Sequence, residues 1–484
     1  MNRRMWNAIL GITLASCLLP DLSAAESTTS NTSANAGDWG TFDVGSGIIH
    51  LELKGDCNAS PCAPGAGVRR PVDVLLWYPA DKKSYAAGSP TIYGLRLNGV
   101  TLDPTKWDPA SWTVIAERAR DGVAVDQDGP SFPFIIASHG GPGDPQNSAP
   151  TLERLASHGF IVAAPFHNGG TLDDQFTDMI NLRAAKKIVP CLDGGPSPCL
   201  DAIQKEVQNR ALDVTALLDT IGSYFGDRVD TERVGVLGQS RGSALALAVA
   251  GGNTTWHIAP EPRVDAIMLM ASANRAAMLL QNLGNITVPA LIVNSKADRM
   301  NPMSISIDVF NAIASEEKGL VILERGEHGV YSSQRCSNMQ VAGAIYQANA
   351  RAIIEQFTME NIMLAATSGT PIDYCTYGYF VNPVDVTPLV KTITGFTVTP
   401  ENVPKMLDTD NAMRLIVELA STYFDATLVK KGQPGVHFKQ YISPKFLMKK
   451  EGDIVSYSES ESFQGRAAEC DDLGLASLDP SCAD

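Results

Sequence analysis

Clustered basic residues are missing from this chain of 484 residues, which has 38 Lys and Arg, 53 Asp and Glu, and a formal net charge of -15. Phosphate binding needs grouped Lys and Arg side chains that release counterions, so the composition excludes a nucleic-acid partner. The sequence also lacks internal repeats. Its length and its 44% of hydrophobic residues fit one large domain with insertions, or two domains, and exclude wholesale disorder.

Long apolar runs are scarce as well. The one candidate, Met5–Leu19, has about 15 residues, lies behind two arginines and is followed by the small residues Ser23–Ala25. A membrane-spanning helix needs about 20 residues. The pattern predicts a cleaved signal peptide over residues 1–25, and a soluble mature chain that is secreted or periplasmic. In an alternative interpretation Cys17 becomes a lipidated N-terminus, but Leu18 is a poor residue to follow such a cysteine.

Metal-binding spacings such as CxxC and HxxxH are absent, so we expect no metal and no cofactor, although a zinc site is the alternative use of the cysteines. Eight of the nine cysteines follow the signal peptide. An oxidising compartment favours disulfides. We expect four structural bridges between sequence neighbours, namely Cys57 with Cys62, Cys191 with Cys199, Cys336 with Cys375, and Cys470 with Cys482.

The order of hydrophobic segments predicts the fold. Gly47–Lys54 and Val72–Tyr78 alternate as antiparallel edge strands do. From Phe132 onward, continuous apolar strands alternate with segments of helical spacing, which is typical of a buried parallel sheet with crossover helices. The expected strands after Phe132 occupy residues 132–140, 160–167, 233–238, 264–271, 289–295 and 319–326, and the expected helices 151–159, 209–226, 243–250 and 306–314.

The resulting fold class is α/β, a doubly wound, mostly parallel sheet with a lid insertion and a C-terminal extension. The chain divides into a flexible leader (26–44), a core (45–330) with a lid-like insertion (171–208), an insertion after the last predicted strand (331–405), a final core helix (406–429) and a polar extension expected on the surface (430–484).

A GxSxG pentapeptide, Gly238–Gly242, lies between the predicted strand at 233–238 and the predicted helix at 243–250. The bare pattern is weak, but a sharp strand-to-helix turn presents a serine hydroxyl above the sheet, which predicts Ser240 as a nucleophile. Side chains in place of the two glycines would clash in so tight a turn. The alternative is a plain turn with Ser240 capping the helix.

A nucleophilic serine needs a base, and the base needs an acid that fixes its tautomer. Asp298 and His328 follow two later strands in the chain order expected for such a sheet, and we predict them as acid and base. A capping or surface role is the alternative for each. Four other histidines have different expected places. His50 lies in a predicted strand and His158 at the end of a predicted helix, whereas His257 lies in a surface loop and His437 in the polar tail. Only His437 among them also follows Ser240 and Asp298.

The oxyanion of the reaction needs two N–H donors. Ser138–Gly143, with the sequence SHGGPG, follows the first buried strand, where such a loop belongs. We predict the backbone N–H groups of Gly141 and Arg241 as the donors, because Pro142 has none. His139 is then a residue that shapes the loop rather than a base.

These motifs resemble the bacterial proteins called predicted dienelactone hydrolases, relatives of platelet-activating-factor acetylhydrolase among the α/β-hydrolases. The resemblance covers roughly residues 45–330 and the last helix. It is carried by RPVDVLLWYPA, SHGGPG, VAAPFHNGG, NRALDVTALLDTI and VLGQSRGSALAL, followed by Asp298 and His328. It implies a cofactor-free serine carboxylic-ester hydrolase with Ser240, Asp298 and His328 as nucleophile, acid and base.

Two other functions stay open. The HGGPG loop is similar to that of proline iminopeptidases, but those enzymes typically have a tryptophan where Arg241 stands here. A non-catalytic binding protein on the same scaffold is the second alternative. The expected substrate is a small, lipid-like or polymeric ester, with apolar walls from Phe166, Met300 and Met303. Asp173 and Asp174 are acidic candidates for a peptidase site, without diagnostic spacing.

Overall fold

A computed structural model describes residues 39–54, 69–94, 113–141, 143–167, 198–272, 282–295, 298, 301, 303–323, 328, 330–331, 409–431 and 454–458. The predicted signal peptide, residues 332–405 of the expected insertion, His437 and the side chains of all the cysteines lie outside the described residues. Within those ranges no helix is long and apolar enough to cross a membrane.

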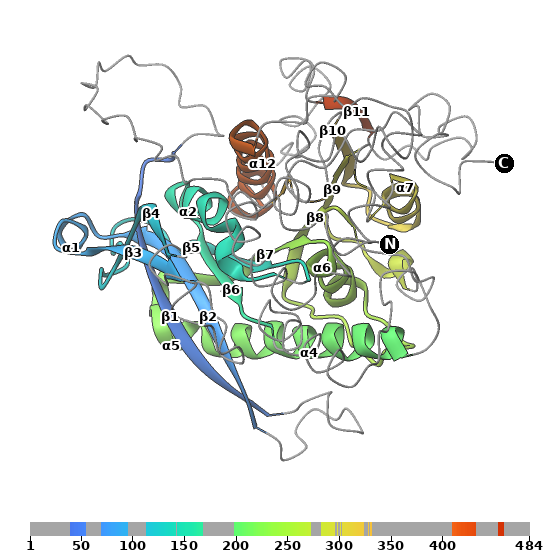
Figure 1. The fold of residues 1–484 in the computed structure, drawn as a ribbon, viewed down its shortest axis with the longest axis horizontal. Coiled ribbons are helices and arrows are strands. Elements are labelled where there is room, and N and C mark those ends of the chain that lie inside the picture. The colour runs from blue at the N-terminus through green and yellow to red at the C-terminus, as the bar shows by residue number, and fades with distance from the viewer. Residues whose placement is uncertain are drawn as a thin grey trace, which may run out of the picture. The chain divides into compact units, whose positions relative to one another are not determined.

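One mixed sheet contains the described strands, in the order β11-β10-β9-β8-β7-β5-β6-β2-β1-β4-β3. The parallel part is β5 to β10, and β2 joins β6 in antiparallel orientation (Figure 1). The strands are β1 Asp43–Lys54, β2 Arg69–Ala80, β3 Ser89–Gly94, β4 Thr113–Asp121, β5 Phe132–Ser138, β6 Ile161–Pro165, β7 Val229–Gln239, β8 Val264–Met270, β9 Ala290–Ser295, β10 Lys318–Leu323 and β11 Ile454–Ser458.

Helices cover both faces of the sheet, as a doubly wound fold requires. Apolar side chains of α2 and α12 belong to one buried cluster, and those of α4, α6 and α7 to another, on the opposite face. The helices are α1 Lys82–Tyr85, α2 Ala149–Ser157, α4 Pro198–Thr220, α5 Gly222–Phe225, α6 Arg241–Gly251, α7 Met303–Ala312 and α12 Thr409–Phe424, which continues as a π-helical turn, Asp425–Val429.

The central strands read as continuous apolar runs because both of their faces are covered. All seven residues of β5 are buried, and so are all six of β9 and of β10. After β6 the chain crosses back over β5 and adds β7 on its other side. Such a reversal of strand order leaves a crevice at the carboxyl ends of the two strands, where ligands bind in open α/β sheets. The Ser138–Gly238 pairing of β5 with β7 places both predicted catalytic loops at this crevice.

Three expected boundaries differ from the structure. The leader was expected to reach residue 44, but Phe42 packs edge-on against Phe132 and β1 begins at Asp43. The lid-like insertion was expected to reach residue 208, but α4 begins at Pro198, because the helical segment continues upstream of the periodic part that identifies it.

The third difference lies in the polar extension, where β11 pairs antiparallel with β10. Its sequence, IVSYS, is too short to be identified from an apolar run. The extension was expected on the surface, and in the structure it also contributes this edge strand to the sheet.

Candidate active site

The turn between β7 and α6 holds Ser240 in a strained backbone conformation, with φ 51° and ψ -115°. A positive φ costs a residue with a side chain about 1–3 kcal/mol and is found mainly at functional sites. The flanking glycines make the turn possible. A Cβ at Gly238 would lie 2.2 Å from the Gly242 carbonyl oxygen, and one at Gly242 would lie 2.0 Å from that of Ser138. The GxSxG sequence therefore reflects two backbone contacts that no other residue permits.

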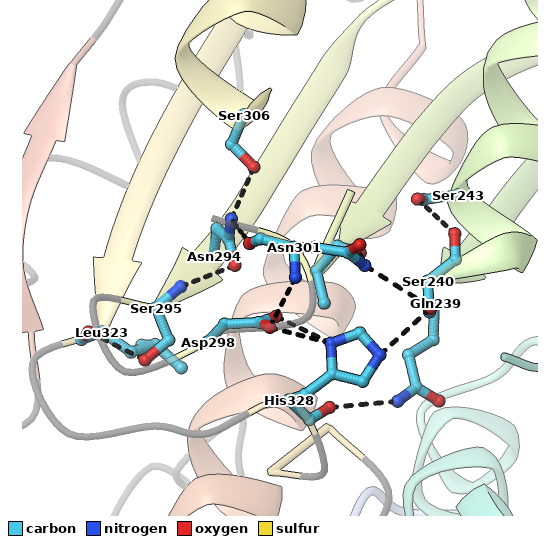
Figure 2. Close-up of polar contacts among 11 residues, drawn as sticks. Gln239, Ser240, Ser243, Asn294, Ser295, Asp298, Asn301, Ser306, Leu323 and His328 are labelled. Atoms are coloured by element: carbon cyan, nitrogen blue, oxygen red, sulfur yellow. Dashed lines mark hydrogen bonds and ion pairs between the residues drawn. The ribbon is translucent and has the colours of Figure 1, made fainter. Parts of the chain in front are cut away.

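The structure brings together the three side chains predicted as nucleophile, base and acid (Figure 2). The Oγ of Ser240 lies 3.1 Å from His328 Nε2, and His328 Nδ1 lies 2.8 Å and 3.0 Å from the two carboxylate oxygens of Asp298. Exposed fractions are 6% for Ser240, 5% for His328 and 3% for Asp298. Since Asp298 only accepts, His328 carries its proton on Nδ1 and leaves Nε2 free to accept the serine proton.

Asn301, which sequence reasoning missed, supports this arrangement. Its backbone N–H donates to Asp298 Oδ1 over 2.9 Å, and its amide nitrogen donates to the Ala271 carbonyl oxygen over 2.8 Å and lies 3.5 Å from Ser240 Oγ. A second hydrogen bond fixes the orientation of the acid. The only signal in the sequence was its position three residues after a predicted acid.

The glycine loop after β5 lies against the nucleophile. A Cβ built on Gly140 would be 3.3 Å from the Cβ of Ser240, and one on Gly141 would be 2.6 Å from Cδ of Arg241. The two residues predicted as N–H donors, Gly141 and Arg241, are therefore in contact through the Arg241 side chain. Arg241 begins α6, so its N–H stands at a helix N-terminus, where negative charge is favoured.

The remaining histidines have other surroundings. His139, within the glycine loop, and His167 are buried, His50 is exposed beside Asp73, and His158 caps α2. Burial, and then the charge of Arg210, lowers the pKa of His167 from 6.5 to about 4, and the same two causes lower the pKa of His139 well below 6.5. His167 follows β6 at the same sheet edge as the predicted catalytic residues. In the sequence, His167 was noted only as part of the family motif VAAPFHNGG and not as a site residue.

The predicted apolar walls are only partly described. Phe166 is buried directly after β6, and Met303 packs in the cluster that contains α4 and α6. Met300, Asp173 and Asp174 lie outside the described residues. Across the described ranges, no group of three or more His, Cys, Asp or Glu side chains is placed to hold a metal ion.

Comparisons with known proteins found one matching family model and similar solved structures. The model of a family described as PET hydrolase-like matches residues 199–348, which include Ser240, Asp298 and His328, and no curated protein matches. Among solved structures, a ferulic acid esterase from Streptomyces cinnamoneus is 18% identical, with 82% of this chain and 93% of that chain covered and a TM-score of 0.46. The sheet topology and the family match confirm the predicted α/β-hydrolase fold and the resemblance to this group of hydrolases.

Proposed function

We propose that the protein is a serine hydrolase that cleaves carboxylic esters through an acyl-enzyme intermediate. The observation that carries this proposal is the hydrogen-bonded series from Ser240 through His328 to Asp298 at the carboxyl edge of the sheet. Nucleophile, base and orienting acid are the groups that acyl transfer needs, and they are in hydrogen-bonding contact here. The family described as PET hydrolase-like adds support for ester substrates, polyesters included.

In the proposed first half-reaction, Ser240 Oγ attacks the ester carbonyl carbon while His328 Nε2 takes the hydroxyl proton. Asp298 keeps the imidazole in the correct tautomer and stabilises the imidazolium that forms. The N–H groups of Gly141 and Arg241 stabilise the negative oxygen, each with an effect of about 3 kcal/mol on the barrier.

His328 then gives the proton to the departing alcohol, and the acyl group stays on Ser240. In the second half-reaction, water loses a proton to His328 and attacks the acyl carbon. The tetrahedral intermediate collapses to a free acid, and Ser240 recovers its proton. In this proposal the steps use the side chains of Ser240, His328 and Asp298, two backbone N–H groups and water.

Esters are favoured over peptides because an alkoxide is a better leaving group than an amine, which must first be protonated on nitrogen. An aminopeptidase would also need carboxylates that bind the substrate amino group. Arg241 stands where proline iminopeptidases typically have tryptophan, which also favours the esterase.

The test compares kcat/KM for short- and long-chain p-nitrophenyl esters, a polyester film and proline p-nitroanilide, together with labelling by a fluorophosphonate. We expect fast ester cleavage, slow amide cleavage and one labelled serine. Ser240→Ala should lose the label and lower kcat about a millionfold. Faster cleavage of the proline amide would favour the peptidase, and an unlabelled wild-type protein would favour a binding function.

We also propose that the chain is exported. N-terminal sequencing of the protein purified from its native host should find a mature end near residue 26. A lipid-modified Cys17 at the N-terminus would instead support the anchored alternative.

A further inference from the structure

A second serine–histidine–aspartate series lies beneath the glycine loop. Ser138 Oγ is 3.0 Å from His167 Nε2, and His167 Nδ1 is 2.7 Å from Asp213 Oδ2. The three side chains come from the end of β5, from the residues after β6, and from α4. His167 and Asp213 are completely buried, and the Ser138 Oγ lies between two buried side chains, those of His167 and Arg210, which both contact it. The series therefore calls for a role other than nucleophilic attack.

Arginines at the two ends fix the direction of its hydrogen bonds. Arg210 Nη1 donates to Ser138 Oγ over 3.0 Å, so the Ser138 hydroxyl proton is left to donate to His167 Nε2. His167 Nδ1–H then donates to Asp213, which also accepts from Arg70. Each group has one possible role, so a single arrangement of protons satisfies the whole series.

The protonation of the two buried histidines agrees with this arrangement. Burial, and then the charge of Arg210, lower the pKa of His167 to about 4, and the contact with Asp213 opposes these two effects only in part. His139 has its pKa lowered by burial, then by Arg210 and then by His167. Both imidazoles are neutral at neutral pH, as a ring that must accept at Nε2 requires.

The same groups hold the backbone of the glycine loop. Arg210 Nη1 also donates to the His139 carbonyl oxygen over 2.5 Å. His139 Nδ1–H donates to the Gly140 carbonyl oxygen over 2.6 Å, and its Nε2 accepts from the His167 backbone N–H over 3.4 Å. In a trans peptide the C=O and N–H point in opposite directions. Fixing the Gly140 carbonyl toward His139 therefore also fixes the direction of the Gly141 N–H.

We propose that Asp213, His167, Ser138 and Arg210 form a positioning relay that, with His139, holds the Gly141 N–H ready for the oxyanion of the substrate. This inference rests on the proposed esterase function. None of the four side chains touches substrate, so each is a positioning residue. The relay acts by preorganisation, because a donor already aimed at the developing charge needs no rearrangement during the reaction.

Glu206 connects the relay to the other predicted donor. One of its carboxylate oxygens accepts from Arg210 over 2.7 Å, and the other accepts from Arg241 over 2.5 Å. One carboxylate therefore holds both the guanidinium that contacts the glycine loop and the side chain of the other predicted donor residue.

The test uses His167→Gln and Asp213→Asn, with His50→Gln as the matched control, since His50 forms a comparable 2.5 Å contact with Asp73 on the surface. The kcat on esters is calculated per site that a fluorophosphonate labels on prolonged incubation. Misfolded protein, which is not labelled, therefore does not lower the measured kcat. We expect kcat per labelled site to fall about 100-fold in both relay variants, as for a displaced catalytic group, with KM changed by less than about threefold. His50→Gln should match the wild type.

Inhibition by phenylboronic acid provides a readout that a purely structural role would not move. Its tetrahedral adduct on Ser240 uses the same N–H donors, so its inhibition constant should rise in proportion to the fall in kcat. Ser138→Ala removes one hydroxyl and is the mildest variant. Combined with His167→Gln it should add little, because the two residues act in series.

The outcomes separate the relay from the esterase. Relay variants with a lower melting temperature but unchanged kcat per labelled site and boronate inhibition would overturn the positioning role and leave the esterase intact. If the fold-decreases in kcat of Ser138→Ala and His167→Gln multiplied in the double variant, the two residues would not act in series, and the proposed relay would be wrong. A wild-type protein that no fluorophosphonate labels would overturn the proposed function and this inference with it.

Discussion

Acid should destabilise this protein through His167. Complete burial, and then the charge of Arg210, lowers the pKa of its imidazole from 6.5 to about 4 in the folded chain. Unfolding removes both influences, so the unfolded chain binds the extra proton first. The unfolding free energy therefore has its full value above pH 6.5 and falls by about 1.4 kcal/mol per pH unit, or about 3 kcal/mol in all, as the pH drops to 4.

Urea unfolding at about pH 7, 6 and 5 measures this effect in the wild type, His167→Gln and His50→Gln. Between the first and last pH, His167 should account for a loss of about 2 kcal/mol. His139, whose pKa is also lowered by burial, adds a loss in the same direction. The His167→Gln plot of free energy against pH should be shallower by about 1 kcal/mol per unit on average over this range, and that of His50→Gln unchanged. Equal slopes in all three proteins would refute the reasoning.

Four further predictions follow from single contacts. Asp298→Asn should favour the wrong imidazole tautomer and lower kcat on esters about ten-thousandfold. Gly242→Ala places a Cβ 2.0 Å from a backbone oxygen of β5 and should lower the unfolding free energy, measured in urea, by about 3 kcal/mol. Its control is Gly47→Ala, whose Cβ would meet no atom within 4 Å and should change the unfolding free energy by less than about 1 kcal/mol. Tyr423→Phe loses two carbonyl partners and should cost about 1–2 kcal/mol in the same assay. Alkylation without reduction should find no free thiol among the eight cysteines of the mature chain, and eight would contradict the disulfides.

The proximity of Ser240 and His328, which are 88 positions apart, could be predicted because their strands are easy to identify. Buried parallel strands are continuous apolar runs, and their carboxyl ends meet at one edge of the sheet. A polar residue directly after such a run is therefore near the others whatever the sequence distance. His167 follows β6 in the same way and could have been found by the same argument.

The relay partners of His167 could not be predicted by this argument from strand ends. Arg210 and Asp213 belong to NRALDVTALLDTI, where charged residues at helical spacing indicate a solvated face. In the structure both are completely buried. Burying a charge is costly without a partner, and the partner of Asp213 is Arg70, which lies 143 positions earlier on β2. Only the sheet order that joins β2 to β6 brings the two together, and no local pattern specifies that order.

Backbone strain also occurs both at a residue that the sequence predicts and at one that it does not. Ser240 and Ala271 follow adjacent strands, β7 and β8, and have φ values of 51° and 49°. GxSxG predicts the first, since its glycines fit only a tight turn. An alanine gives no such signal, because positive φ is read from glycine or asparagine. Tertiary contacts maintain Ala271: its N–H donates to the Val293 carbonyl oxygen over 2.9 Å, and its own carbonyl accepts from Asn301, whose N–H holds Asp298. Strain at a residue without sequence signal therefore supports the acid, and the fold has to form before that position has a reason to be strained.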